Sequence, residues 1–502
     1  MITPLQSAMI EFKKTKRKPT FLLIVIVCLI NLCYLFIGTK KNSMADFEQA
    51  WEAVFFYLPL LNSLFLSVLV AVLASRTMDL EHKSGIWNLL QTLQSKRSIY
   101  LGKVIYGFIW IVIYALFQMV TTISFSKYMG FRGLPSTRLI LLTILGEIIG
   151  AMIIYQLQMI FSLIFSSQFA ALSISLCGTL GGFFLMYVSD RILLPWSMIG
   201  ALRVLNMDYN KGDEFSTYTE YLAPFSFWVV AIMYIAVTLI AGLYLYSRME
   251  ENHLPGIHTN LREGKLHTIL PPELIKLKRS PVWIVFFVMP LISGLIGMFN
   301  FVANQDALDY TWADLWTQQS LFLGIFFLSP MIAIIASLMW RMEHNGTNWN
   351  IALTIEKPAK LIRDKYLVIC GVSILCILWI GTIFIISGKI LKLPGSVPMD
   401  FYECMICGCC GCLAVASIQA YLSLRIRSFA IPVGMALAGG LAGIALIAKG
   451  YGFFLPYGLI TMGLKSTNLT TDLNIPLFMF ISILYAAFFY VLSLHHIKHT
   501  DA

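Results

Sequence analysis

Charged residues are scarce in this sequence of 502 residues: they make up 12% of it, whereas hydrophobic residues make up 58%. A soluble domain carries about 25% charged residues, so the composition excludes an ordinary soluble protein. Apolar runs near the roughly 20 residues that cross a bilayer recur along the chain. Because these runs are continuous and do not alternate with polar residues, they also exclude a transmembrane β-barrel. The composition predicts an all-α integral membrane protein.

Acidic residues are fewer than basic ones, 26 against 36, which gives a net charge of +10. Such an excess can indicate a nucleic-acid partner, but no basic stripe with interleaved aromatic residues is present. Lys and Arg gather instead at the ends of apolar runs, as the positive-inside rule expects. A small-residue cleavage site is also missing after the first apolar run, 21–38, so we expect no cleaved signal peptide.

The chain has ten cysteines, and most of them lie within apolar runs, so no disulfide framework is implied. Five of them crowd into "CMICGCCGC", residues 404–412. On a helix, Cys404, Gly408, Gly411 and Cys412 share one side, which favours close helix packing over metal or redox chemistry. We therefore expect no metal site.

Twelve transmembrane helices are predicted from the apolar runs. Basic residues in the N-terminal segment and after the second, sixth and eighth spans predict that both termini are cytoplasmic. We expect the protein to lie in the plasma membrane of a cell. The predicted spans are 20–39, 54–74, 103–124, 139–165, 168–188, 226–247, 282–302, 320–340, 365–387, 402–424, 429–448 and 475–494.

The sequence repeats itself at a spacing of 262 residues. "EFKKTKRKP" (11–19) lies over "ELIKLKRSP" (273–281), and "EHKSGIWN" (81–88) lies over "EHNGTNWN" (343–350). The register later slips by one residue, so that Gln158 meets Gln419. With six spans each, the halves form parallel repeats. The expected domains are a first repeat 1–247, a cytoplasmic linker 248–270 and a second repeat 271–502, and each repeat begins with an amphipathic helix. "LLPWSMIGAL" (193–202) and "FLPYGLITMGL" (454–464) predict short re-entrant or interfacial helices.

The Glu-His…Trp-Asn stretch lies on the cytoplasmic side between the second and third spans of each repeat. One copy fits a loop resting on the bilayer surface as well as it fits a docking element. Two copies at matched places favour docking elements for a two-fold partner, because symmetric sockets require symmetric contacts.

These stretches, the six-span unit and the N-terminal amphipathic helix resemble the type-2 permease family of ABC transporters, above all the lantibiotic and bacteriocin immunity permeases. The resemblance implies two permease units fused in one chain, with the stretch after the second span resting on an ATPase. It carries the role of ATPase coupling to Glu81, His82, Gly85, Trp87 and Asn88 in the first copy, and to Glu343, His344, Thr347, Trp349 and Asn350 in the second.

The same resemblance implies two copies of a separate ATPase subunit, which would bind ATP and Mg²⁺, because this sequence contains no Walker A motif. We therefore expect no catalytic residue and no bound cofactor in this chain. The implied function is export of an amphipathic antimicrobial peptide, a lantibiotic or bacteriocin, from the membrane of a Gram-positive bacterium. Other amphiphiles, such as a drug, a lipid or a toxin peptide, are alternatives, and so is an ion-coupled secondary transporter.

Four polar residues inside apolar runs are candidates for the substrate path. Glu147 is the only acid well inside a span, where it could contact a substrate or cation or could be a neutral packing residue. Gln156, Gln158 and Gln419 could line a pore, although a hydrogen bond between packed helices is the more common role of such residues.

Overall fold

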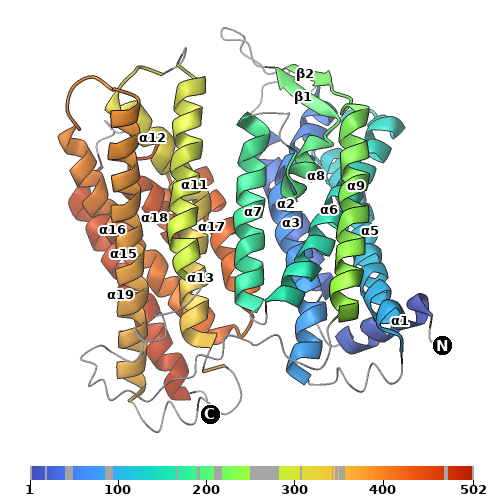
Figure 1. The fold of residues 1–502 in the computed structure, drawn as a ribbon. Helices are drawn as coiled ribbons and strands as arrows, with labels where there is room; N and C mark the ends of the chain where they lie inside the picture. The colour runs from blue at the N-terminus through green and yellow to red at the C-terminus, as the bar shows by residue number, and fades with distance from the viewer. Residues whose placement is uncertain are drawn as a thin grey trace. The chain divides into compact units, whose positions relative to one another are not determined.

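The computed structural model contains two compact units, residues 1–261 and 262–502. Both are built almost wholly of helices (Figure 1). The structure describes residues 3–16, 20–39, 49–84, 94–165, 168–188, 193–208, 217–248, 282–305, 308–341, 343–344, 349, 357–467 and 473–499. The expected linker 248–270, apart from Arg248, and the expected second amphipathic helix near 271 lie outside these ranges.

Among its described residues, the first unit contains seven long or medium helices, two short helical segments and two strands. In chain order these are α1 (Pro4–Thr15), α2 (Thr20–Thr39), α3 (Ala50–Ser84), α5 (Lys96–Tyr128), α6 (Thr137–Ile164), α7 (Gln168–Val188), η2 (Pro195–Ser197), α8 (Met198–Ala201), β1 (Leu205–Asp208), β2 (Thr217–Glu220) and α9 (Phe225–Arg248).

The second unit repeats the order of its spans. Its elements are α11 (Val282–Ala303), α12 (Trp312–Phe322), the π-helical segment η3 (Leu323–Phe327), α13 (Leu328–Arg341), α15 (Pro358–Ile390), α16 (Met399–Arg425), α17 (Ala430–Ile447), η4 (Gly452–Phe454), α18 (Pro456–Gly463) and α19 (Ile475–His499).

Nine helices among the described residues are long and apolar enough to cross a membrane, or ten if the bent pair α1–α2 counts as one span. The expected spans 168–188 and 429–448 coincide with the shorter apolar stretches of α7 and α17. Several helices are longer than the apolar runs that predicted them. Helix α15, for example, begins at Pro358 rather than at residue 365. Hydropathy marks the part of a helix inside the hydrocarbon, whereas the helix itself continues into polar residues outside it.

The expectation of a helical fold is confirmed, and one small sheet is present beside the helices. Strands β1 and β2 pair antiparallel, with Leu205 opposite Glu220 and Asp208 opposite Thr217. Each strand has only four residues. Strands this short leave no periodic signal in a sequence, so a search based on apolar runs could not find them.

Helix α1 shows its apolar residues to the outside of the unit and its small or polar residues to the inside. Leu5 and Met9 are each 57% exposed, whereas Ser7, Ala8 and Glu11 are buried against the rest of the unit. The helix packs on α5 so closely that a side chain at Gly102 would clash with Ser7. It runs at 82° to α2. An apolar outer face at a steep angle to the spans suits a helix lying in the membrane interface.

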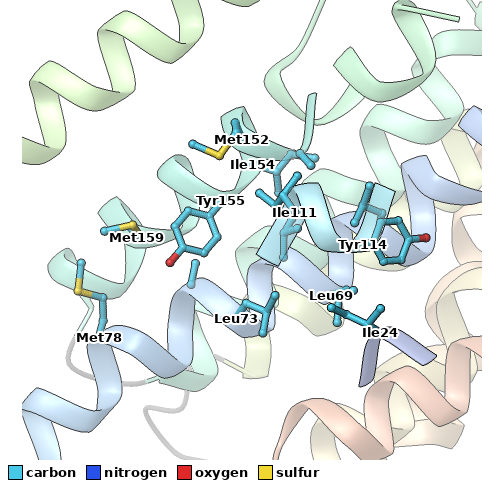
Figure 2. Packing of buried hydrophobic residues seen from close by; sticks show 14 of the residues in the cluster. Ile24, Leu69, Leu73, Met78, Ile111, Tyr114, Met152, Ile154, Tyr155 and Met159 are labelled. Atoms are coloured by element: carbon cyan, nitrogen blue, oxygen red, sulfur yellow. The ribbon is translucent and has the colours of Figure 1, made fainter. Parts of the chain in front are cut away.

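The core of the first unit is a cluster of apolar side chains between α3, α5 and α6. Figure 2 shows Leu69 and Leu73 of α3 beside Ile111 of α5 and Met152 of α6. Tyr155 belongs to this cluster and lies against Gly107, where a larger residue would overlap its ring. Its hydroxyl donates to the backbone oxygen of Lys103 at 3.0 Å, which satisfies the one polar atom that the ring brings into the core.

The two expected short helices are present, and each lies in a slot lined with glycine. In the first unit, a side chain at Gly178 would overlap Trp196, and one at Gly150 would come within 3 Å of Ile199. In the second unit, Gly439 lies in the same way against Tyr457, and Gly411 against Leu459. Gly178 and Gly439, like Gly150 and Gly411, are 261 residues apart. The repeat is therefore visible in matching internal contacts as well as in matching residue identities.

We predict that Gly182→Ala destabilises the chain whereas Gly181→Ala, one residue away on α7, does not. A Cβ at Gly182 would lie 2.8 Å from the backbone carbon of Trp196, and backbone cannot move aside as a side chain can; a Cβ at Gly181 meets nothing within 4 Å. Overpacking costs about 1–3 kcal/mol. Thermal unfolding in detergent should show a lower midpoint than the wild type for Gly182→Ala and an equal or higher one for Gly181→Ala. Equal losses in both variants would contradict the close packing of α7 against the short helix.

Candidate coupling sites and a buried polar cluster

A fully buried lysine stands near the start of the third span in the first unit. The ammonium of Lys103 donates to the backbone oxygen of Thr77 at 2.9 Å and to Glu11 Oε1 at 3.1 Å. Thr77 lies in the last turns of α3 and Glu11 on α1, so one side chain joins three helices. A buried charge of this kind is tolerated because it is both paired and hydrogen-bonded.

The surroundings of Glu11 shift the pKa of its carboxyl in two opposing directions. Burial alone would raise the pKa of its carboxyl, but the ammonium groups of Lys103 and Lys14 outweigh it and hold the pKa below its usual range. Around this pair, Phe12 lies edge-on to Tyr106 at 4.8 Å between ring centroids, and the Tyr106 hydroxyl donates to Thr15 Oγ1 at 3.1 Å. Helix α1 is therefore anchored to α5 by an ion pair with aromatic contacts beside it.

The second unit contains the matching lysine with a different carboxylate. Lys365 donates to the backbone oxygen of Met339 at 2.6 Å and to Glu343 Oε1 at 2.8 Å. Lys365 lies 262 residues after Lys103, and Met339 lies 262 residues after Thr77. The lysine-to-carbonyl bond is thus common to both units. Among the described side chains, Lys103 pairs with an acid of α1 and Lys365 with an acid just beyond α13.

Aromatic residues surround the second pair. The Lys365 ammonium lies 5.0 Å from the ring of Trp340, and Trp349 stacks on Trp340 with 5.8 Å between centroids. Trp349 Nε1 donates to His344 Nδ1 at 3.4 Å, and His344 Nε2 lies 2.9 Å from the backbone oxygen of Ser423 on α16. The carbonyl requires a donor, so the hydrogen-bond pattern assigns the neutral tautomer with its proton on Nε2.

The structure describes some of the coupling residues expected from the sequence and leaves others outside the described ranges. Glu343 is buried and ion-paired with Lys365. His344 and Trp349 lie together beside it, and Glu81 and His82 belong to the last turn of α3. Gly85, Trp87, Asn88, Thr347 and Asn350 lie outside the described residues. The sequence alone did not predict the roles of Lys103, Lys365 and Glu11, although all three fall at matched positions of the repeat.

A second polar site lies inside the first unit, where five buried side chains from four helices meet. We call Asn31, Asn62, Tyr114, Gln118 and Glu147 the polar cluster. Asn62 is its hub: it donates to Glu147 Oε1 at 2.7 Å and to Gln118 Oε1 at 2.9 Å. Its own oxygen accepts from Tyr114 at 2.7 Å and from Asn31 and Gln118 at 3.0 Å each. Of the five, Glu147 alone was a candidate from the sequence; its partners are single polar residues scattered over three other apolar runs.

The model of the family described as ABC-2 family transporter protein matches residues 9–182 and, a second time, residues 269–443. Together these matches cover more than half of the chain. This chain belongs to the ABC-2 family of transporter proteins. One match falls in each compact unit, as a duplicated permease requires. No curated protein sequence matches the chain. The family assignment agrees with the type-2 permease resemblance, while the narrower lantibiotic immunity group stays a prediction.

The three glutamines of the expected substrate path are buried in this ABC-2 transporter protein and hydrogen-bonded in different ways. Gln156 accepts from Thr238 of α9 at 2.6 Å, and Gln419 donates to the Tyr457 hydroxyl of α18 at 2.5 Å. Gln158 donates within its own helix to Ser162 at 3.4 Å. Gln156 and Gln419 thereby join neighbouring helices, which is one of the two roles expected from the sequence.

The cysteine cluster lies where α16 meets α18. Cys404, Cys407 and Cys412 are buried, and a side chain at Gly408 or Gly411 would clash with Leu464 or with the backbone of Leu459. The described residues contain no group of three or more His, Cys, Asp or Glu side chains that could hold a metal ion. Small side chains on this face of α16 allow α18 to approach closely.

We predict that Lys365→Met strongly destabilises the second unit, because it leaves the Glu343 carboxylate buried without its cation. Breaking one partner of a buried pair costs about 3–5 kcal/mol. The exposed Lys357→Met is the matched control, and Glu343→Gln combined with Lys365→Met should recover part of the loss. Thermal unfolding in detergent measures all three; a Lys365→Met midpoint equal to that of the control would show that the pair contributes nothing.

We predict that acid weakens the contact between His344 and Trp349. Burial lowers the pKa of His344, against the opposing effect of the Ser423 carbonyl. The stabilising contribution is therefore full above the ordinary histidine pKa of about 6.5 and is lost as the pH falls through the lower folded-state value. Unfolding midpoints between pH 8 and pH 5 should fall more for the wild type than for His344→Gln. Parallel curves for the two chains would refute this.

Proposed function

We propose that this chain is the whole membrane permease of an ATP-driven ABC exporter, with two copies of an ATPase subunit on separate chains. The observation that carries the proposal is the repeated Glu-His…Trp-Asn stretch, found once in each half of an ABC-2 family chain. A partner with two equal subunits needs two equal contact sites, and the fused units supply them. The ATPase would bind ATP and Mg²⁺; no catalytic residue or bound cofactor is assigned to this chain.

Each coupling stretch would act through the buried lysine beside it. In the second unit, Trp349 stacks on Trp340, and Trp340 lies against Lys365 at the start of α15. A push on the stretch would therefore reach α13, α15 and, through His344, α16. In the first unit, Lys103 connects the end of α3 with α5 and α1. The force would enter both units at the same place.

For the substrate we propose an amphipathic antimicrobial peptide, a lantibiotic or bacteriocin, exported from the plasma membrane of a Gram-positive bacterium for self-protection. This rests on the resemblance of the sequence to immunity permeases. Another amphiphile, such as a drug, a lipid or a toxin peptide, would suit the same arrangement. An ion-coupled secondary transporter is less favoured, because it needs intramembrane charges in both halves, and Glu147 has no acidic counterpart at Gly408 or Cys409.

We predict that an ATPase co-purifies with the tagged chain, expressed with its neighbouring genes, at two copies per chain, and that Trp87→Ala with Trp349→Ala releases it. Each single variant should retain part of the ATPase, since one site stays intact. Phe225→Ala is the control, because Phe225 is 82% exposed and lies at the opposite end of α9 from Arg248.

Thermal unfolding of each variant separates loss of binding from loss of folding, since Trp349 also packs on Trp340. Failure of any ATPase to bind the folded wild-type chain would overturn the exporter proposal. The secondary-transporter hypothesis would then become the stronger one.

A further inference from the structure

Glu147 is a carboxyl group in an environment that has no place for its charge. It lies well inside the span Thr137–Ile164 and is 2% exposed. No ion pair among the described residues includes it. Helices α2, α7 and α8 contain no Lys, Arg or His. Of the titratable groups that interact with Glu147, Cys28 comes from α2 and Tyr114 from α5, and neither can carry a positive charge. The facing residue of α3 is Asn62, which does not titrate.

Two buried acceptor oxygens of the polar cluster receive no hydrogen bond. Asn62 uses both amide hydrogens, on Glu147 and Gln118, and Asn31 uses both of its own, on Asn62 and Tyr114. Tyr114 gives its single hydrogen to Asn62. Glu147 Oε2 and Asn31 Oδ1 are buried and receive none. An ionised carboxylate needs donors at both oxygens, whereas here one oxygen has one donor.

A proton on Oε2 would resolve both deficits of the carboxyl group. It would remove the buried negative charge, and it would turn an acceptor without a donor into a donor. Oε1 would continue to accept from Asn62 as the carbonyl oxygen of a neutral carboxylic acid. We propose that Glu147 is a proton-binding site within the membrane, which holds one proton at neutral pH while α2, α3, α5 and α6 are packed as they are here.

The site belongs to one unit only. At the equivalent spacing, the second unit has Ser293 for Asn31, Gly324 for Asn62, Cys376 for Tyr114 and Ile380 for Gln118. None of these residues can build the same network. The chain therefore binds one proton in this way, not two. If the four helices separate at any stage of a transport cycle, Oε2 becomes hydrated and the proton can leave, so the packing of the first unit is linked to proton release.

Infrared spectroscopy of the purified full chain tests the protonation directly. At neutral pH, the wild type should show the carbonyl stretch of a buried protonated carboxyl, and Glu147→Gln should lack it. Glu220→Gln is the matched control, because the Glu220 side chain is 77% exposed and lies outside the polar cluster. A spectrum in which Glu147→Gln loses a carboxylate band instead would overturn the proposal. Titration of the band in the wild type needs no variant, so the test survives a variant that does not fold.

Stability provides a second readout. The folded chain keeps a proton that the unfolded chain releases above the ordinary glutamate pKa of about 4.3. Its stability relative to Glu147→Gln should therefore rise as the pH is lowered from 8 to 5. Parallel pH curves would refute the site. If sodium or potassium chloride raises the unfolding midpoint of the wild type but not of Glu147→Gln, the site binds a metal cation and the proton proposal fails. None of these measurements depends on an ATPase.

Discussion

A bilayer offers no water to a polar group, so every charge that enters a span must find its partner inside the protein. Lys103 and Lys365 are the strictest cases, since both ammonium groups are fully buried. Each is held by a carbonyl from the end of the preceding span and by a carboxylate, and these bonds tie the second span to the third where the chain leaves the membrane. The segment between these spans is thus anchored at both ends. Both helices that flank the segment are therefore joined to each other by these bonds.

The two units keep this anchor. Among the described residues, the carboxylate beside Lys103 comes from α1, and the one beside Lys365 is Glu343, with two stacked tryptophans next to it. A symmetric dimer of identical chains could not place a polar site in one half alone, because each change would appear twice. Fusion of the units in one chain removes that restriction. The polar cluster, present in the first unit alone, is the clearest product of this freedom.

Prediction from the sequence succeeded where a pattern is long or repeated. The helices, the duplication and the short helices near Pro195 and Pro456 all leave such patterns. It could not find the polar cluster, because Asn31, Asn62 and Gln118 are isolated polar residues that hydropathy averages away, and only the packing of four helices makes them partners. Nor could it foresee that Glu343 points inward, since an acid beside a histidine and a tryptophan suits a surface contact equally well. The β1–β2 hairpin left no periodic signal at all.

The slip in the repeat lies close to the residue that matches Glu147. Gly130 and Gly133, which have positive φ after α5, match Lys392 and Gly395 after α15 at a spacing of 262. The slot glycines Gly150 and Gly411 match at 261. One residue is therefore missing between these points, and because α6 and α16 begin 262 apart, at Thr137 and Met399, the loss falls within the first turns of α16. Removing one residue from a helix rotates the part before the deletion by about 100° relative to the part after it. Even so, Gly408 lies against Leu464 as Gly146 lies against Leu202, so this side of the helix has matching contacts in both units. The units differ in chemistry at this level: Gly408 and Cys409 occupy the place of the acid, and Gly324, Cys376 and Ile380 occupy the places of its polar partners.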